Sequence, residues 1–138
     1  MSNPKTAFFA KYVTSGYTTI IGVEDKDFWV GTPGVVNLSE PKDIPSGEVI
    51  LLNEVLQKVD DPVALLKECA SKAPKILITV PNEHSWPPQY EPFKNPAHKR
   101  FYDTDLLAQH LDEAGLVYLI NVIEYAGWSF LSAEATKA

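Results

Sequence analysis

Apolar residues along this chain follow two periods, one typical of strands and one typical of helices. Continuous apolar runs predict three strands that are buried on both faces, over 18–23, 48–53 and 75–80. A shorter run predicts a brief strand over 35–38. These four segments define the expected centre of a sheet.

Apolar residues at helical spacing predict three helices, over 6–14, 62–72 and 104–114. Pro62 suits the first turn of the second helix, and Asp60 or Asp61 suits its N-cap. Gly115 suits the end of the third helix because glycine readily adopts the left-handed backbone of a C-cap. The helices are therefore bounded by local signals.

The last part of the chain predicts an antiparallel hairpin, with strands over 116–123 and 128–133 joined by the turn 124–127. Residues 134–138 predict a frayed tail. The segment 82–101 predicts a long loop that is rich in proline and aromatic residues. A loop of this length is uncommon in a compact domain and often carries function.

Apolar strands that alternate with amphipathic helices predict an α/β fold. The expected architecture is a doubly wound, three-layer sandwich around a mostly parallel sheet, with the hairpin as an antiparallel edge. A chain of 138 residues suits one domain, which we expect to span 1–138.

The composition narrows the classes of partner. A net charge of −6 makes nucleic acid an unsuitable general partner, because phosphate binding needs a basic surface. Cys69 is the single cysteine and cannot form an intramolecular disulfide, which suits a reducing compartment. No apolar run is long enough to cross a membrane, and no signal peptide is evident, so we expect a cytoplasmic protein. The histidines and the cysteine show no metal-ligand spacing.

Three segments carry motifs in the order and at the separations of one known family. The segment ILLNEVLQKVDDP, followed after a helix and a strand by VPN, is similar to a strand, an EVLEH-V-x-x-P run and a V-P-N loop. The segment HKRFYDTDLLAQHLDEAGL is similar to H-x-R-x-[FY] and a helix L-x-x-x-L-x-x-A-G. The segment IIGVED is similar to V-V-G-V-D. Over roughly 6–133 the chain therefore resembles the class I S-adenosylmethionine (SAM) methyltransferases, of the type 11 and type 23 kinds.

The chain departs from this family at its N-terminal end. The family's sheet has the order 3-2-1-4-5-7-6, and the resemblance places its D-x-G-x-G-x-G loop near 2–6, where no residue is glycine. Gln57 and Lys58 replace its EH pair. We therefore expect a Rossmann-like sandwich whose central first strand is missing. We expect 18–23 to pair directly with 48–53, because buried backbone groups need partners; a strand from another chain or a rearranged N-terminal region are alternatives.

The resemblance also implies a cofactor site for SAM. It places Glu24 where the family's acidic residue binds the ribose hydroxyls, with Asp25 as a substitute, and it places Asn53 near the methionine part. Glu54 is a candidate general base, because a carboxylate in a partly dry cleft can have a raised pKa. The alternatives are a solvated strand end for Glu24 and a loop-capping role for Glu54.

The long loop carries the remaining candidates. His84 is a candidate catalytic proton acceptor. The candidate residues for binding the methyl acceptor are Asn82, Trp86, Tyr90, His98 and Arg100. The two aromatic rings suit a planar acceptor, and the basic residues, with Lys94 and Lys99, suit an anionic group. The alternatives are a stiff loop packed by its own aromatic side chains and a solvated basic segment.

Two function classes follow from the resemblance. The first is a SAM-dependent methyltransferase that acts on a small molecule or a polymer. The second is a non-catalytic domain of the same fold that serves binding or assembly. Apart from these two classes, the chain could be one that a partner completes. An exposed sheet edge invites self-association, so we expect a homodimer.

Overall fold

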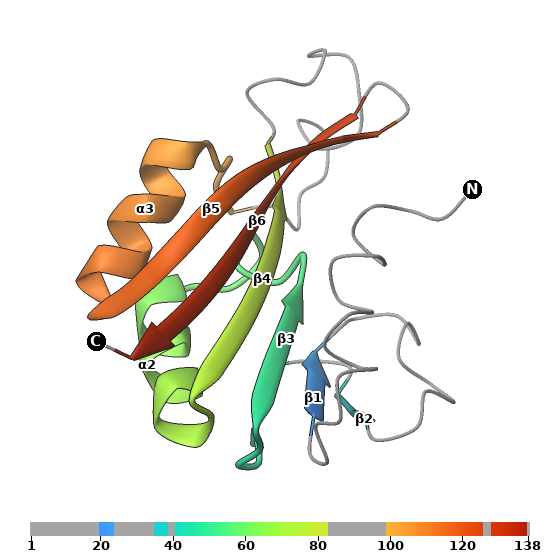
Figure 1. Cartoon of the computed structure of the whole chain (residues 1–138), viewed down its shortest axis with the longest axis vertical. Helices are drawn as coiled ribbons and strands as arrows, with labels where there is room; N and C mark the ends of the chain where they lie inside the picture. Colours follow the sequence, from blue (N-terminus) through green and yellow to red (C-terminus); the bar gives the residue numbers. More distant parts are fainter. Residues whose placement is uncertain (1–19, 24–34, 39–40, 83–98, 126–127, 138) are drawn as a thin grey trace.

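A computed structural model describes residues 20–23, 35–38, 41–82, 99–125 and 128–137 (Figure 1). These residues form a six-stranded sheet and two helices. The strands are β1 (Ile20–Val23), β2 (Val35–Leu38), β3 (Val49–Asn53), β4 (Lys75–Pro81), β5 (Leu116–Tyr125) and β6 (Trp128–Lys137). The helices are α2 (Pro62–Lys72) and α3 (Thr104–Glu113). The predicted helix over 6–14 lies outside the described residues.

The sheet has the strand order β2-β1-β3-β4-β6-β5. Strands β1 to β4 pair in parallel, and β6 pairs antiparallel with both β4 and β5. Strand β1 pairs directly with β3, with Ile20 opposite Val49 and Val23 opposite Leu52. The predicted direct pairing is therefore confirmed. The order is the expected one with its central strand missing.

Helix α2 begins and ends where its local signals predict. Asp61 is the N-cap, and its carboxylate accepts a hydrogen bond of 3.0 Å from the backbone N–H of Ala64. Pro62 occupies the first turn, where its missing N–H costs no intrahelical bond. The buried side of the helix carries Leu65, Leu66 and Cys69.

Helix α3 follows the same rules. Asp103 is its N-cap and accepts a hydrogen bond of 2.8 Å from the N–H of Leu106. Gly115 follows its C-terminal end with a φ of +75°, a left-handed conformation that glycine adopts without strain. Leu107 and Leu111, four residues apart, form its buried side.

The prediction of a frayed tail over 134–138 is wrong for residues 134–137. These residues belong to β6, where Glu134 pairs with both Leu77 and Leu119. The segment is rich in alanine and polar residues, so its own strand propensity is low. It is nevertheless ordered as a strand because β4 and β5 flank it on both sides and Ala135 is buried between them.

One apolar core joins the two helices to one face of the sheet (Figure 1). Its fully buried members include Leu66, Leu107, Leu111, Ile50, Ile78 and Leu131. The opposite face of the central strands is buried as well, since Leu51 and Leu77 have no exposed surface. The prediction that β3 and β4 are buried on both faces is therefore confirmed.

Candidate functional site

The candidate site lies at the carboxyl ends of β3 and β4. From β1 the chain crosses to β2 on one side, and from β3 it crosses to β4 on the other, so the winding direction reverses between β1 and β3. Open α/β sheets bind ligands outside the carboxyl ends of the strands at such a reversal. Strand β3 ends at Asn53 and β4 ends at Pro81, which places both ends at the same edge.

Asn53 is held at this edge by its neighbour on β4. The two residues Asn53 and Thr79 are directly opposite in the strand register, and both are buried. The Thr79 hydroxyl donates a hydrogen bond of 2.7 Å to Oδ1 of Asn53. This bond fixes the orientation of the Asn53 amide, so a polar group stands preorganised at the end of the strand.

Glu54 follows Asn53 in a left-handed backbone conformation, with φ of +56°. Its N–H donates to the carbonyl of Thr79 at 2.9 Å, and its own carbonyl accepts a hydrogen bond of 3.0 Å from Nε2 of Gln57. A residue with a Cβ atom in this region is uncommon and costs about 1 kcal/mol or more. Such strain is common at functional sites. Among the described residues other than glycine, Asp43 before β3 has the same φ, and Glu54 is the one that lies at the candidate site.

The end of β4 is joined to the beginning of β6. The side-chain amide of Asn82 donates to the hydroxyl of Ser129 at 3.1 Å, and the backbone N–H of Asn82 donates to the carbonyl of Ser129 at 3.0 Å. Ser129 is buried, although sequence reasoning did not single it out. Only the pairing of β4 with β6 brings these residues together, and no local motif signals it.

The loop over 54–60 is held by the segment that follows the long loop. The Arg100 guanidinium donates to the carbonyls of Leu56 and, at 3.2 Å, of Asp60. Lys99 donates from its backbone N–H to the carbonyl of Gln57 at 2.7 Å, and its ammonium forms an ion pair with Asp60. Lys99 also holds the pKa of the Asp60 carboxyl below its ordinary value. Arg100 thus positions this loop, and its predicted contact with an acceptor stays a prediction.

Gln57, which with Lys58 replaces the EH pair of the resembled family, was not predicted as a site residue. Its side chain is buried, and within the described part of the chain its Oε1 atom has no hydrogen-bond partner. An unpaired buried carbonyl of this kind costs on the order of 1–3 kcal/mol. The loop after β3 therefore carries two unfavourable features, the left-handed Glu54 and the unpaired Gln57 oxygen, within four residues.

The fold is similar to that of several solved structures. No protein-family model matches the sequence, and no curated protein matches it. A SAM-dependent methyltransferase from Archaeoglobus fulgidus is similar with a TM-score of 0.69 and 16% identity, over 96% of this chain and 92% of that one. The N-terminal domain of EvdMO1 with SAH bound gives a TM-score of 0.60 and 15% identity, over 100% and 82% of the two chains.

A third similar structure is magnesium protoporphyrin IX methyltransferase (ChlM) from Synechocystis PCC 6803 with bound SAH. Its TM-score is 0.59 and its identity is 8%, over 96% of this chain and 80% of that one. The chain shares the fold of these three structures. The Rossmann-like architecture expected from the sequence is therefore confirmed.

Four of the predicted site residues are described: Asn53, Glu54, Asn82 and Arg100. The first three lie at the carboxyl ends of β3 and β4, and Arg100 lies in the segment before α3 and contacts the loop that follows β3. The other six lie outside the described residues and stay predictions: Glu24, Asp25, His84, Trp86, Tyr90 and His98.

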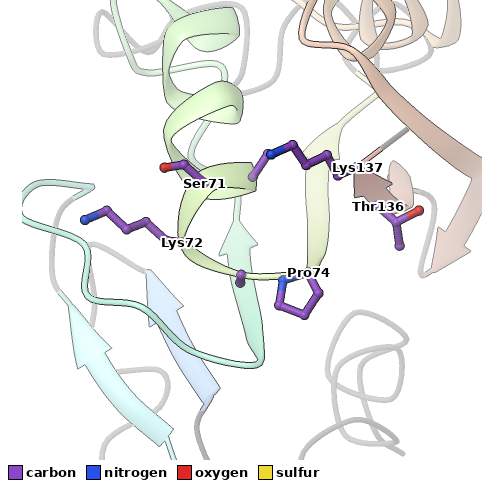
Figure 2. Close-up of a pocket in the computed structure, with 7 residues that line it drawn as sticks. Ser71, Lys72, Pro74, Thr136 and Lys137 are labelled. Carbon is purple, nitrogen blue, oxygen red and sulfur yellow. The ribbon is translucent and has the colours of Figure 1, made fainter.

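A hollow of about 400 Å³ lies at the opposite end of the sheet (Figure 2). It is lined by the end of α2, the approach to β4 and the end of β6, with Ser71, Lys72, Pro74, Thr136 and Lys137 among its residues. It is thus separate from the candidate site. Among the described residues, no group of three or more potential metal ligands occurs, and no helix is long and apolar enough to cross a membrane.

Proposed function

We propose that this protein is a SAM-dependent methyltransferase whose methyl acceptor binds at the carboxyl ends of β3 and β4. Solved structures of the same fold include a SAM-dependent methyltransferase and two proteins with SAH bound, which supports a SAM site. The observation that carries the proposal is the left-handed Glu54 beside the buried Asn53, next to the point where the winding direction reverses. The expected cytoplasmic location stays a prediction.

The described residues fit the acceptor side of such a site. SAM, when bound, supplies the methyl group. Asn53 is buried and oriented by Thr79, and so gives the end of β3 beside the site a fixed geometry. Glu54 is half-buried and accepts a proton from the acceptor when the acceptor must lose one. Glu24, which the resemblance assigns to the ribose hydroxyls, lies outside the described residues.

The strained backbone supports a role for the Glu54 side chain. Glycine adopts a φ of +56° without a steric cost, so packing alone favours glycine here. A glutamate at this position therefore has a cost that the fold does not require. A carboxylate held at a rigid strand end is well placed for catalysis, because effective proton transfer depends on a fixed geometry.

Isothermal titration calorimetry with SAM and SAH tests the cofactor half of the proposal. We expect binding in the micromolar range to the unaltered chain and a loss of at least about tenfold in Glu24→Ala, since each ribose hydrogen bond contributes about 1 kcal/mol or more. The matched control is Glu68→Ala, which removes an exposed carboxylate on α2 and should leave binding unchanged. No heat at millimolar SAM or SAH contradicts the proposal.

The direct pairing of β1 with β3 favours a second function. In the family's strand order, the central strand lies between the counterparts of β1 and β3, and here the two strands are directly paired. This arrangement narrows the sheet where the cofactor is expected, which suits a non-catalytic module of the same fold that serves binding or assembly. The same titration separates the two functions, because only the enzyme requires binding of SAM.

A further inference from the structure

Strand β5 forms one edge of the sheet. It is ten residues long and ends the strand order, and its backbone pairs with β6 alone among the described strands. Every other residue of an edge strand directs its N–H and C=O groups outward. The described part of the chain supplies no partner to that outer row.

Over residues 116–123 this edge lacks the features that usually keep edges apart, and Glu124 near its end is its one charged residue. Residues 116–123, LVYLINVI, contain no charged residue, no proline and no glycine. Natural edge strands are commonly short, charged or interrupted, since a long apolar edge pairs readily with another strand. The opposite edge of the sheet meets this rule, because β2 has only four residues.

Strand β5 carries exposed apolar side chains on both faces of the sheet. Val117 and Leu119 are 53% and 58% exposed on the face that points away from α3. On the same face of β6, Phe130 and Ser132 are buried, and Glu134 and Thr136, which lie opposite Leu119 and Val117, are half-buried. Val122 is 51% exposed on the other face. The covering of the sheet therefore stops at β6, and β5 extends beyond it.

Helix α3 covers only the first half of β5. Its contacts include a hydrogen bond of 2.9 Å from the Tyr118 hydroxyl to the Asp112 carboxylate, and Leu116 is buried in the core beneath it. The acidic residues of α3, Asp112 and Glu113 among them, therefore lie beside the amino-terminal half of β5. The second half, with Val122, has no such covering.

We propose that β5 pairs antiparallel with β5 of a second copy of this chain, which extends the sheet across a two-fold axis. A net charge of −6 makes two copies repel, and the uncharged stretch over 116–123 is a surface where they can approach with little local repulsion. Antiparallel pairing places the acidic α3 helices at opposite ends of the interface. It also gives the outer backbone row its hydrogen bonds and covers Val117, Leu119 and Val122.

Sedimentation velocity combined with light scattering tests this pairing. We expect the unaltered chain to have twice its 15.3 kDa mass. Val117→Lys should raise the dimer dissociation constant by about 100-fold or more, because it places a charged side chain on an edge whose first eight residues are uncharged, and edge lysines oppose pairing with another strand. The matched control is Val36→Lys, the same substitution at a valine that is 47% exposed on β2, and it should leave the dimer intact.

Circular dichroism of both variants establishes that each is folded, and Leu119→Lys serves as a second variant on the same strand. A chain that stays monomeric up to about 1 mM overturns the proposal, because even weak pairing is populated at that concentration. A dimer that Val36→Lys dissociates and Val117→Lys does not also overturns it. Neither result bears on SAM binding, so this proposal stands apart from the proposed function.

Discussion

The interior of the sheet differs from its rim, defined as Asn53, Glu54, Gln57 and Asn82 at the carboxyl ends of β3 and β4. Within β3 and β4, Ile50, Leu52 and Ile78 are fully buried among apolar neighbours. A few residues farther along, the rim has a left-handed Glu54 and a buried Gln57 oxygen that has no hydrogen-bond partner among the described residues. The interior stabilises the fold, whereas the rim contains costs that packing does not explain. This difference is why we propose the rim as the site of function.

The largest effect is expected in the interior. Leu66→Ala should lower the free energy of unfolding by about 3 kcal/mol, because Leu66 is fully buried and its truncation leaves a cavity. Chemical denaturation with urea measures this change. The control Lys67→Ala alters the next, exposed residue of α2 and should change the free energy by less than about 0.5 kcal/mol. A loss at Leu66 no larger than that of the control would contradict the assignment of the core.

A smaller loss of stability is expected where the interior meets the rim. Thr79→Val keeps the shape of the side chain but removes the hydroxyl that donates to Asn53. The free energy of unfolding should fall by about 1–2 kcal/mol, because an acceptor in a buried place loses a hydrogen bond. Thr79→Ser retains the hydroxyl and should restore much of the loss. Equal losses in the two variants would show that the bond to Asn53 is unimportant.

At the rim itself, a substitution should raise the free energy of unfolding instead of lowering it. Glu54→Gly relieves the left-handed strain and should raise the free energy of unfolding by about 0.5–1 kcal/mol. Glu54→Ala removes the same carboxylate but retains a Cβ atom, so it should give no comparable gain. The comparison of these two variants by urea denaturation isolates the backbone contribution. A Glu54→Gly variant less stable than Glu54→Ala would argue against stored strain.

The smallest effect concerns pH and His110. This residue lies outside the rim, and its Nδ1 is 2.8 Å from the hydroxyl of the buried Tyr102. Burial lowers the pKa of His110, and the nearby Arg100 charge lowers it further. The folded chain therefore binds fewer protons than the unfolded chain between the two pKa values. The contribution of His110 to the stability of the fold is complete above the ordinary histidine pKa of about 6.5, and it is lost as the pH falls through the pKa of His110 in the folded chain.

Urea denaturation between pH 8 and pH 5 measures this dependence. The variant His110→Gln retains a polar side chain without a titrating ring, so its stability should vary less over the same range. If the two proteins show the same dependence on pH, the loss of stability must come from other groups.

Local patterns predicted the elements of the interior well. The caps Asp61 and Gly115 and the apolar runs of β3 and β4 lie where the sequence places them, because these signals act within a few residues. The pairing of β1 with β3 followed from the requirement that buried backbone groups be paired. The last residues of β6 were missed because two flanking strands, and not the propensity of the segment, make it a strand.

The rim was predicted less completely. Asn53, Glu54 and Asn82 were found because they follow apolar runs that end at one edge of the sheet. The partners of this edge, Thr79 and Ser129, depend on the register between strands far apart in the sequence. The contacts of Arg100 with backbone carbonyls could not be anticipated either, since they depend on how two loops meet.

We propose that the rim, and not the hollow at the opposite end of the sheet, binds a SAM-type ligand. Amide chemical shifts measured by NMR during a titration with SAH test it most directly. We expect the largest shifts at Asn53, Glu54 and Asn82, with Ser71 and Thr136 beside the hollow unchanged. Shifts confined to the hollow, or no shifts at millimolar SAH, would contradict the account.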